Sequence, residues 1–562
     1  MQNLRDYLLI ACLGALLFFP FLGQSHLFDW DEINFAEASR EMVVTGNYTQ
    51  TQIDFRQFWE KPPFFFWLQA GSMHLFGINE YAARFPNAVC GILTLMLLFA
   101  IGTFHYDRRM GWWWVLCYAG SILPQFYFKS GIIDPWFNLF IFLGIYGFIR
   151  YLEQNRSLKW LVISALGAGL SVLTKGPVGV ALVGLTVGFY YITTRFRHFP
   201  PIWHLLLYIL CLALPIMPWV AIEVSKNGTW FIQEFFTYQT RLATTEDASH
   251  GGFPGYHFVV LLFFCFPAST FAIGNMAVKQ HCTPQLQTMR KWMLILFWVV
   301  LIVFSIVQTK IAHYSSMAYF PLTFLAALRI REMVKPTKLE VILLCITGIT
   351  IGICMIALPI VLQHPDALLP YMQDIFTQQA IYADGLWMGW EWILGVISII
   401  VICIIAIIAR KRSADVVMSA LFVSVMIIIN IAITIITPKI ERYSQGAMID
   451  FLEEKSQESC YTEIIGFKSY AHLFYGQRKL EDTTNPLYMK WIKEQHPDTT
   501  VLTPLDYRKL YGQWLMYGEI DKPAYLITNA RKKDFLEVRT DISLVESKNG
   551  YYFYVRQPVK QP

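Results

Sequence analysis

The chain has 562 residues, of which 55% are apolar, 16% aromatic and only 15% charged. Soluble globular proteins carry about 25% charged residues, so this composition excludes an ordinary soluble enzyme and indicates long segments shielded from water. A net charge of +5 is too small for so long a chain to indicate nucleic-acid binding. We therefore expect a polytopic protein whose surroundings are membrane lipids and which has no nucleic-acid partner.

Apolar segments of span length recur between residues 6 and 437, and they predict about thirteen transmembrane helices. Basic residues gather in six of the short connecting loops, such as the loop at Arg108 and Arg109 and the loop at Lys411 and Arg412. The positive-inside rule places these six loops in the cytoplasm. The intervening loops, which hold most of the irregular sequence, then face outward, and chemistry is expected on that side.

The first outward loop, residues 24 to 82, contains two charged segments. Asp31 and Glu32 open a segment with the apolar spacing of an amphipathic helix on the membrane surface. Carboxylates at this place could simply stabilise the helix N-terminus. Glu60 and Lys61 precede an apolar run, where a lysine could also be an interfacial anchor whose ammonium reaches the headgroups.

Further charges stand at the outer ends of later spans. Asp134 lies between apolar residues at a helix entrance, where an unpaired carboxylate is costly. Lys175 and Lys310 are outward cations, against the basic bias of the cytoplasmic loops. Acids and lysines that converge on one face predict a site for a phosphorylated amphiphile, with cations for its phosphate and carboxylates for the reacting centre.

Residues 438 to 562 have a different composition and predict a small α/β domain on the outer side. The helix-like segment of this tail runs from Asn485 to Glu494. Strand-like segments are Thr462 to Phe467, Thr499 to Leu502, Ala524 to Thr528 and Tyr551 to Val555.

Taken in order over residues 5 to 330, the charged motifs resemble those of the aminoarabinose transferase and protein O-mannosyltransferase group of membrane glycosyltransferases. The matching residues are Asp31-Glu32-x-x-Phe35-Ala36-Glu37-x-x-Arg40-Glu41-Met42, Glu60-Lys61-Pro62, Asp134-Pro135, Thr174-Lys175-Gly176, Arg241, His250 and Lys310-x-x-x-Tyr314. Each motif is short, and the specificity comes from their combination.

The resemblance implies an α-helical polytopic membrane protein with a GT-C fold. Residues 1–437 would form the catalytic transmembrane domain, with periplasmic surface helices in 24–82, and residues 438–562 the periplasmic α/β domain. The implied catalytic residues are Asp31, Glu60 and Asp134, and the implied substrate-binding residues are Glu32, Lys61, Lys175, Arg241, His250, Lys310, His313 and Tyr314.

The same resemblance implies a glycosyltransferase in the bacterial inner membrane, with its active site on the periplasmic face. The donor would be a sugar on a polyprenyl phosphate carrier, with 4-amino-4-deoxy-L-arabinose as one candidate sugar. The acceptor could be lipid A, a glycan or a protein. We expect a monomer and no cofactor, apart from a divalent metal cation that the sequence leaves open. A lipid or sugar transporter is the alternative from another class.

Two positions depart from the family pattern. Asn34 stands where aminoarabinose transferases usually have arginine, which removes a fixed cation. His313 stands in the segment Lys310-Ile311-Ala312-His313-Tyr314, where the family has Lys-Leu-Pro-x-Tyr. A histidine there could bind phosphate or metal, and a hydrogen-bonded structural role is the other interpretation.

Overall fold

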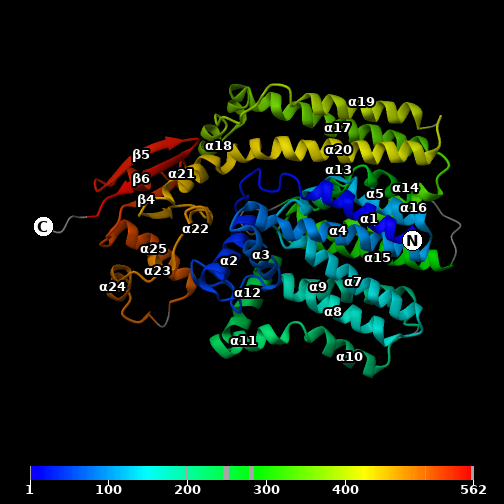
Figure 1. Cartoon of the computed structure of the whole chain (residues 1–562), viewed down its shortest axis with the longest axis horizontal. Helices are drawn as coiled ribbons and strands as arrows, with labels where there is room; N and C mark the ends of the chain where they lie inside the picture. The colour runs from blue at the N-terminus through cyan, green and yellow to red at the C-terminus, as the bar shows by residue number, and fades with distance from the viewer. Residues whose placement is uncertain are drawn as a thin grey trace.

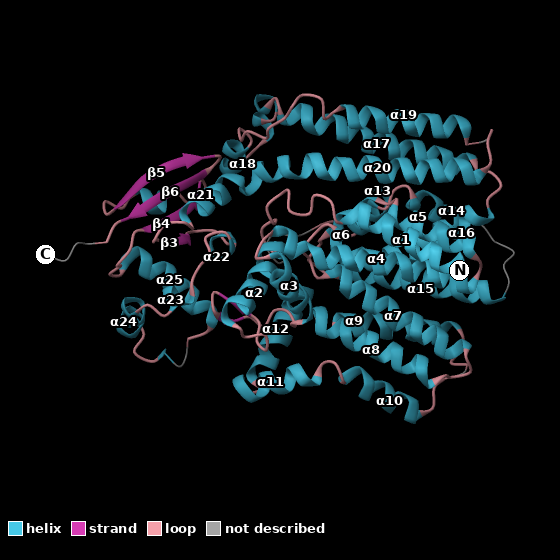
Figure 2. Cartoon of the chain, in the orientation of Figure 1, coloured by secondary structure: helices cyan, strands magenta, loops and turns pink. Residues whose placement is uncertain are grey.

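The structure is a computed structural model that describes residues 2–197, 199–244, 252–277, 284–409, 411–499 and 502–558. Figure 2 shows a mainly helical molecule with a sheet at one end. In Figure 1 the N-terminus lies at the end of the helical body far from that sheet, and α20 leads back toward the sheet. The long helices therefore run between two ends of the molecule, of which one carries the C-terminal domain.

Residues 2 to 193 form nine helices and one small hairpin in the described part of that segment. The elements are α1 (Gln2–Phe18), α2 (Asp31–Thr45), β1 (Gln52–Ile53), β2 (Arg56–Gln57), α3 (Phe64–Phe76), α4 (Glu80–His105), α5 (Arg108–Ala119), α6 (Ile122–Phe128), α7 (Asp134–Glu153), α8 (Leu158–Lys175) and α9 (Val178–Thr193). The expected outer loop 24 to 82 therefore holds α2, the hairpin and most of α3.

The chain continues through α10 (Ile202–Ala213), α11 (Met217–Asn227), α12 (Trp230–Thr244), α13 (Tyr256–Phe264), α14 (Ala268–Ala277), α15 (Pro284–Ile306), the 3-10 helix η1 (Ala312–Ala318) and α16 (Tyr319–Glu332). It then forms α17 (Lys338–Leu362), the short 3-10 helices η2 (Pro365–Ala367) and η3 (Leu369–Tyr371), α18 (Ile375–Ala380), α19 (Ile393–Ile408) and α20 (Ala414–Glu441). Figure 1 shows α17, α19 and α20 side by side along one edge.

Six helices among the described residues are long and apolar enough to cross a membrane alone. Two helix pairs pass the same test together but are bent at a short break, α10 with α11 by 57° and α13 with α14 by 117°. The described residues 256 to 277 therefore do not form one straight helix, because the chain breaks between Phe264 of α13 and Ala268 of α14. The expected number of about thirteen spans stays a prediction.

α20 continues beyond residue 437, because one turn of π-helix η4 (Arg442–Gly446) joins it to α21 (Ala447–Lys455). The α/β domain follows with β3 (Tyr461–Ile464), α22 (Ala471–Phe474), α23 (Leu480–Thr483), α24 (Pro486–Gln495), α25 (Pro504–Tyr517), β4 (Ala524–Asn529), α26 (Asp534–Glu537), β5 (Ile542–Lys548) and β6 (Tyr551–Arg556). Pro438 lies inside α20 and does not end it.

The four long strands form one mixed sheet in the order β3-β4-β6-β5. β3 pairs with β4 in parallel, with Tyr461 opposite Ala524, and the other two pairs are antiparallel. Three strand predictions and the α24 prediction are confirmed, whereas Thr500 and Val501 of the fourth strand prediction lie outside the described residues. β5 was missed because four of its seven residues, including Glu546 and Lys548, lack the apolar character of a strand. Charged residues of this kind protect an exposed sheet edge, which is where β5 lies.

The C-terminal domain shares a hydrophobic core with the first outer loop. This core joins Phe35 and Phe65 to Leu452, Ile527 and Phe553. α2 is therefore covered on both faces, and Glu32 through Met42 are buried. An amphipathic helix on the membrane surface would keep its charged face in water, so this expectation is wrong for α2, and the reason is the C-terminal domain that packs over it.

Candidate functional site

The outer end of the helical body contains a cavity of about 570 Å³. Its walls come from the start of α2, the loop after β2, the α6–α7 turn, the end of α8, η1 and one loop of the C-terminal domain. The polar and charged side chains in these walls are Asp29, Asp31, Glu32, Asn34, Glu60, Lys61, Tyr127, Ser130, Asp134, Lys175, His313, Tyr314 and Lys468. Eight of the eleven residues expected from the sequence are thus brought together.

An ion pair joins the outer ends of α7 and α8. Lys175 Nζ lies 2.6 Å from Asp134 Oδ1, and both side chains are largely buried. Asp134 is the first residue of α7 and Lys175 the last residue of α8, so each charge also suits the dipole of its own helix. The Lys175 ammonium lies 5.2 Å from the centre of the Tyr314 ring. A cation is therefore held at a fixed place in the cavity wall.

His313 connects the two aspartates. Its Nε2 lies 3.7 Å from Asp31 Oδ2 and 4.0 Å from Asp134 Oδ2. Burial lowers the pKa of His313 below its ordinary value, so the imidazole is neutral near pH 7. The carboxylate of Asp31 is 44% exposed to the cavity, which makes it the most accessible acid of this group.

Lys61 and Glu60 stand together in the loop before α3, and both side chains are half-buried. Burial lowers the pKa of Lys61, and the neighbouring Glu60 carboxylate opposes this shift. The carboxylates of Asp31 and Asp134 also raise the pKa of Lys61, whereas the positive charge of Lys175 lowers it. Lys61 and Lys175 therefore line the same cavity, and the charge of Lys175 contributes to the lowered pKa of Lys61.

Glu32 lines the cavity, but protein groups occupy its carboxylate. Arg84 Nε and Nη2 lie 3.0 and 2.8 Å from its two oxygens, and the backbone N–H groups of Phe28 and Gly131 also donate to it. Burial alone would raise the pKa of Glu32, but the Arg84 pair outweighs burial and holds it low. Glu32 therefore fixes the start of α2 against α4 and the α6–α7 turn.

Two expected site residues, Lys310 and Arg241, do not line this cavity, and a third lies outside the described residues. Lys310 donates to the backbone carbonyls of Phe304, Ser305 and Val307, and so caps the C-terminus of α15 instead of pointing at a substrate. Arg241 is exposed on α12. His250 lies outside the described residues.

The structure adds two wall residues that the sequence did not suggest. Trp30 precedes α2 with φ 78° and ψ −100°, a strained conformation for a tryptophan. Lys468, from the loop between β3 and α22, places its ammonium 4.6 Å from the centre of the Trp30 ring. Asp29 fixes this contact, since it accepts hydrogen bonds from the N–H groups of Trp30 and Tyr470. Lys468 lies more than 400 residues from Asp31, so no sequence pattern could place it here.

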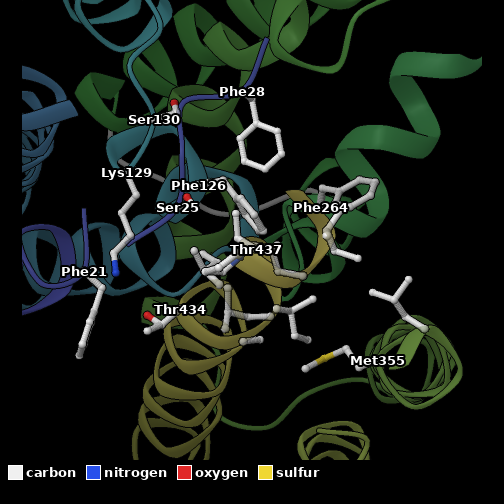
Figure 3. Close-up of a pocket in the computed structure, with 18 of the residues that line it drawn as sticks. Phe21, Ser25, Phe28, Phe126, Lys129, Ser130, Phe264, Met355, Thr434 and Thr437 are labelled. Carbon is white, nitrogen blue, oxygen red and sulfur yellow. The ribbon is translucent and has the colours of Figure 1, made fainter. Parts of the chain in front are cut away.

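A second cavity of about 790 Å³ adjoins the first. Phe28, Glu32, Phe126, Ser130 and Phe264 line both cavities. Figure 3 shows Phe28, Phe126 and Phe264 on one side of this space and Met355 of α17 across from them. Its other walls come mostly from apolar residues of α17 and α20. The charged cavity and this mostly apolar one are thus neighbours that share wall residues.

No group of three or more His, Cys, Asp or Glu side chains in the described ranges could hold a metal ion. Asp31, Asp134 and His313 interact with one another and with the neighbouring lysines instead.

Comparison with known proteins gives a consistent relationship. Residues 60–221 match the family described as dolichyl-phosphate-mannose-protein mannosyltransferase. An undecaprenyl phosphate-alpha-4-amino-4-deoxy-L-arabinose arabinosyl transferase of Photorhabdus laumondii is 24% identical over 378 residues, which are 66% of this chain and 65% of that protein. A protein of the same description from Shewanella sediminis is 26% identical over 313 residues, 54% of this chain and 56% of that protein.

The fold agrees over the whole length. The crystal structure of ArnT from Cupriavidus metallidurans bound to undecaprenyl phosphate superposes with a TM-score of 0.74 at 18% identity, covering 98% of this chain and 97% of that one. The apo structure of the same protein gives a TM-score of 0.76 at 17% identity.

The fold is therefore the GT-C fold of membrane glycosyltransferases. The resemblance seen in the motifs is confirmed, and within this class the chain is related to the aminoarabinose transferases.

Proposed function

We propose that this chain transfers a sugar from a polyprenyl phosphate carrier to an acceptor at the periplasmic face of the bacterial inner membrane. The observation that carries the proposal is the charged cavity, whose walls hold two lysines and an accessible aspartate and share residues with those of an apolar cavity. A lipid-linked sugar phosphate needs this combination of charged and apolar surfaces.

The leaving group in such a transfer is a phosphate monoester, on which negative charge grows as the bond to the sugar breaks. Lys61 and Lys175 are placed to stabilise this charge, because both ammonium groups belong to the cavity wall and are shielded from bulk water. Asp134 and Glu60 hold these lysines through ion pairing and proximity. We assign these two acids to positioning and the two lysines to phosphate binding.

We assign to Asp31 the role of activating or orienting the acceptor. Its carboxylate is open to the cavity and its protein neighbour is the neutral His313. A carboxylate in this setting can accept the acceptor's proton or orient its nucleophilic oxygen. Tyr314 and His313 line the same cavity as Lys61, and we assign this space to the sugar ring.

The carrier tail is assigned to the apolar chamber. Its walls come from α6, α13, α17 and α20, and Phe126 and Phe264 line both this chamber and the charged cavity. The undecaprenyl phosphate named for the related crystal structure is a lipid of this type. The relatives' aminoarabinose is the first candidate for the sugar, and lipid A, a glycan or a protein remain the candidate acceptors.

The test compares a deletion strain with strains that express wild-type protein or Asp31→Asn. Lipid A, glycans and secreted proteins are examined by mass spectrometry, and binding of undecaprenyl phosphate to the purified proteins is measured in nanodiscs. We expect a sugar adduct with wild-type protein only, and undecaprenyl phosphate binding by both proteins. Lys61→Ala should lose binding, whereas Lys159→Ala, an exposed lysine at the other end of the bundle, should retain it.

An adduct that persists with Asp31→Asn would reject the role of Asp31. Equal products in the deletion and wild-type strains would reject the transfer itself. In that case, uptake of a labelled lipid or sugar by vesicles that contain the protein would identify the chain as a transporter.

A further inference from the structure

Asn34 is a polar residue of the cavity wall that has no role in the reaction proposed above. It lies one helical turn after Asp31 on α2, so the two side chains share a face of the helix. Both line the charged cavity. Asn34 is only 8% exposed, and its Oδ1 is a buried acceptor without a hydrogen-bond partner among the described residues.

An unsatisfied buried carbonyl is costly, about 1–3 kcal/mol, and is rare in native structures. The groups that normally explain such an atom are a water molecule or a ligand that donates to it. Because Oδ1 accepts, the ligand must present an O–H or N–H group at this point. A deprotonated phosphate oxygen has no hydrogen to give.

The charges of the cavity also favour an uncharged hydrogen-bond donor over a phosphate at Asn34. Its lysines are Lys61, Lys175 and Lys468, and three acids, Asp31, Glu60 and Asp134, balance them. The Glu32 carboxylate is balanced by Arg84, and Asp29 is a further buried acid. Binding of the donor phosphate therefore already makes the cavity negative. The negative charge on this phosphate grows further as the bond to the sugar breaks.

A phosphate acceptor would add one or two negative charges beside Asp31, and α2 offers no cation there. The family pattern would supply an arginine at position 34, but this chain has a neutral amide. The amide suits an uncharged partner, because it can accept one hydrogen bond and donate two.

We infer that the acceptor attacks through a hydroxyl group of an uncharged unit, such as a sugar ring, and that Asn34 determines this specificity by binding a neighbouring hydroxyl beside Asp31. The inference rests on the proposed function and narrows its acceptor class. The acceptor oxygen forms a bond to the anomeric carbon as the bond from that carbon to the phosphate oxygen breaks. The electron pair leaves with the polyprenyl phosphate, and the acceptor proton passes to Asp31.

The product linkage tests this inference directly. The sugar adduct found by comparison of the deletion and wild-type strains is heated in mild acid, which cleaves glycosyl phosphates and leaves ordinary glycosides. We expect the adduct to survive. An acid-labile glycosyl phosphate would overturn the hydroxyl acceptor and leave the proposed transfer intact. If the two strains yield no differing adduct, the proposed function fails, and this inference fails with it.

Variants of Asn34 test the specificity role. Asn34→Ala should lower the rate of adduct formation about tenfold, as expected for one lost hydrogen bond, with unchanged binding of undecaprenyl phosphate. Asn34→Asp should lower the rate further, because it adds a negative charge beside Asp31. The control is Gln495→Ala, an exposed amide on α24. Membrane abundance and undecaprenyl phosphate binding show whether each variant is folded. A folded Asn34→Ala protein with the wild-type rate would overturn the inference.

Discussion

The Nζ atom of Lys175 lies 2.6 Å from Oδ1 of Asp134, and this pair closes the outer end of the α7–α8 hairpin. Both side chains are largely buried. A buried charge that loses its partner is strongly destabilising. This pair is therefore expected to stabilise the fold in addition to its proposed role in the reaction. The two roles can be separated, because the stability of the hairpin depends on both partners and phosphate binding depends on the lysine.

Lys175→Ala is expected to lower both thermal stability and undecaprenyl phosphate binding. The stability loss is about 3–5 kcal/mol, since Asp134 would remain charged and unpaired. The double variant Lys175→Ala/Asp134→Asn should recover most of the stability but none of the binding. Thermal unfolding of the purified proteins and calorimetric titration with undecaprenyl phosphate measure the two effects. Recovery of binding in the double variant would show that Lys175 has no contact with phosphate.

Binding of undecaprenyl phosphate should weaken as the pH rises, and earlier than an ordinary lysine would allow. Burial lowers the pKa of Lys61 below 10.5, and only the protonated ammonium attracts phosphate. Affinity is therefore full below the lowered pKa and falls as the pH passes through it. Lys61→Arg should flatten this dependence, because arginine stays charged. Titrations between pH 7 and 10 provide the measurement, and identical profiles for the two proteins would exclude Lys61 as the titrating group.

Lys468 is expected to matter although it belongs to the C-terminal domain. Its ammonium lies over Trp30 at the cavity wall, close to the start of α2. Lys468→Ala should slow sugar transfer severalfold, and Lys468→Glu should slow it further because the cavity becomes more negative. Lys490→Ala, on the exposed face of α24, is the matched control. Transfer rates are compared at equal membrane abundance. If Lys468→Glu transfers sugar at the wild-type rate, the C-terminal domain contributes no charge to the reaction.

The six basic loops predict the orientation of the chain in the membrane. Single cysteines at the exposed positions 234 and 490, in a protein without native thiols, should react with an impermeant thiol reagent in intact spheroplasts. A cysteine at position 411, between α19 and α20, should react only after lysis. Labelling of 411 together with protection of 490 would invert the membrane orientation and move the cavity to the cytoplasm.

Much of this protein could be predicted from local sequence. Hydropathy predicted helices of membrane-spanning length, of which six occur singly among the described residues, and the acids and lysines at the ends of the predicted spans indicated the site. The structure gathers Asp31, Lys61, Asp134 and Lys175 in one cavity, as expected from the cost of leaving such charges unpaired near lipid. These residues were recognisable because each one is a charged residue next to an apolar segment of the sequence.

Other roles were decided only by tertiary contacts. Lys310 has the same sequence setting as Lys175, yet the final carbonyls of α15 take up its ammonium. Glu32 adjoins Asp31 in the chain, but Arg84, 52 residues away, binds its carboxylate and leaves Asp31 open to the cavity. Lys468 reaches the cavity only because the C-terminal domain packs on α2. A charged residue next to an apolar segment indicates that its side chain needs a partner. The long-range packing of the chain determines whether that partner is a helix end, another side chain or a substrate.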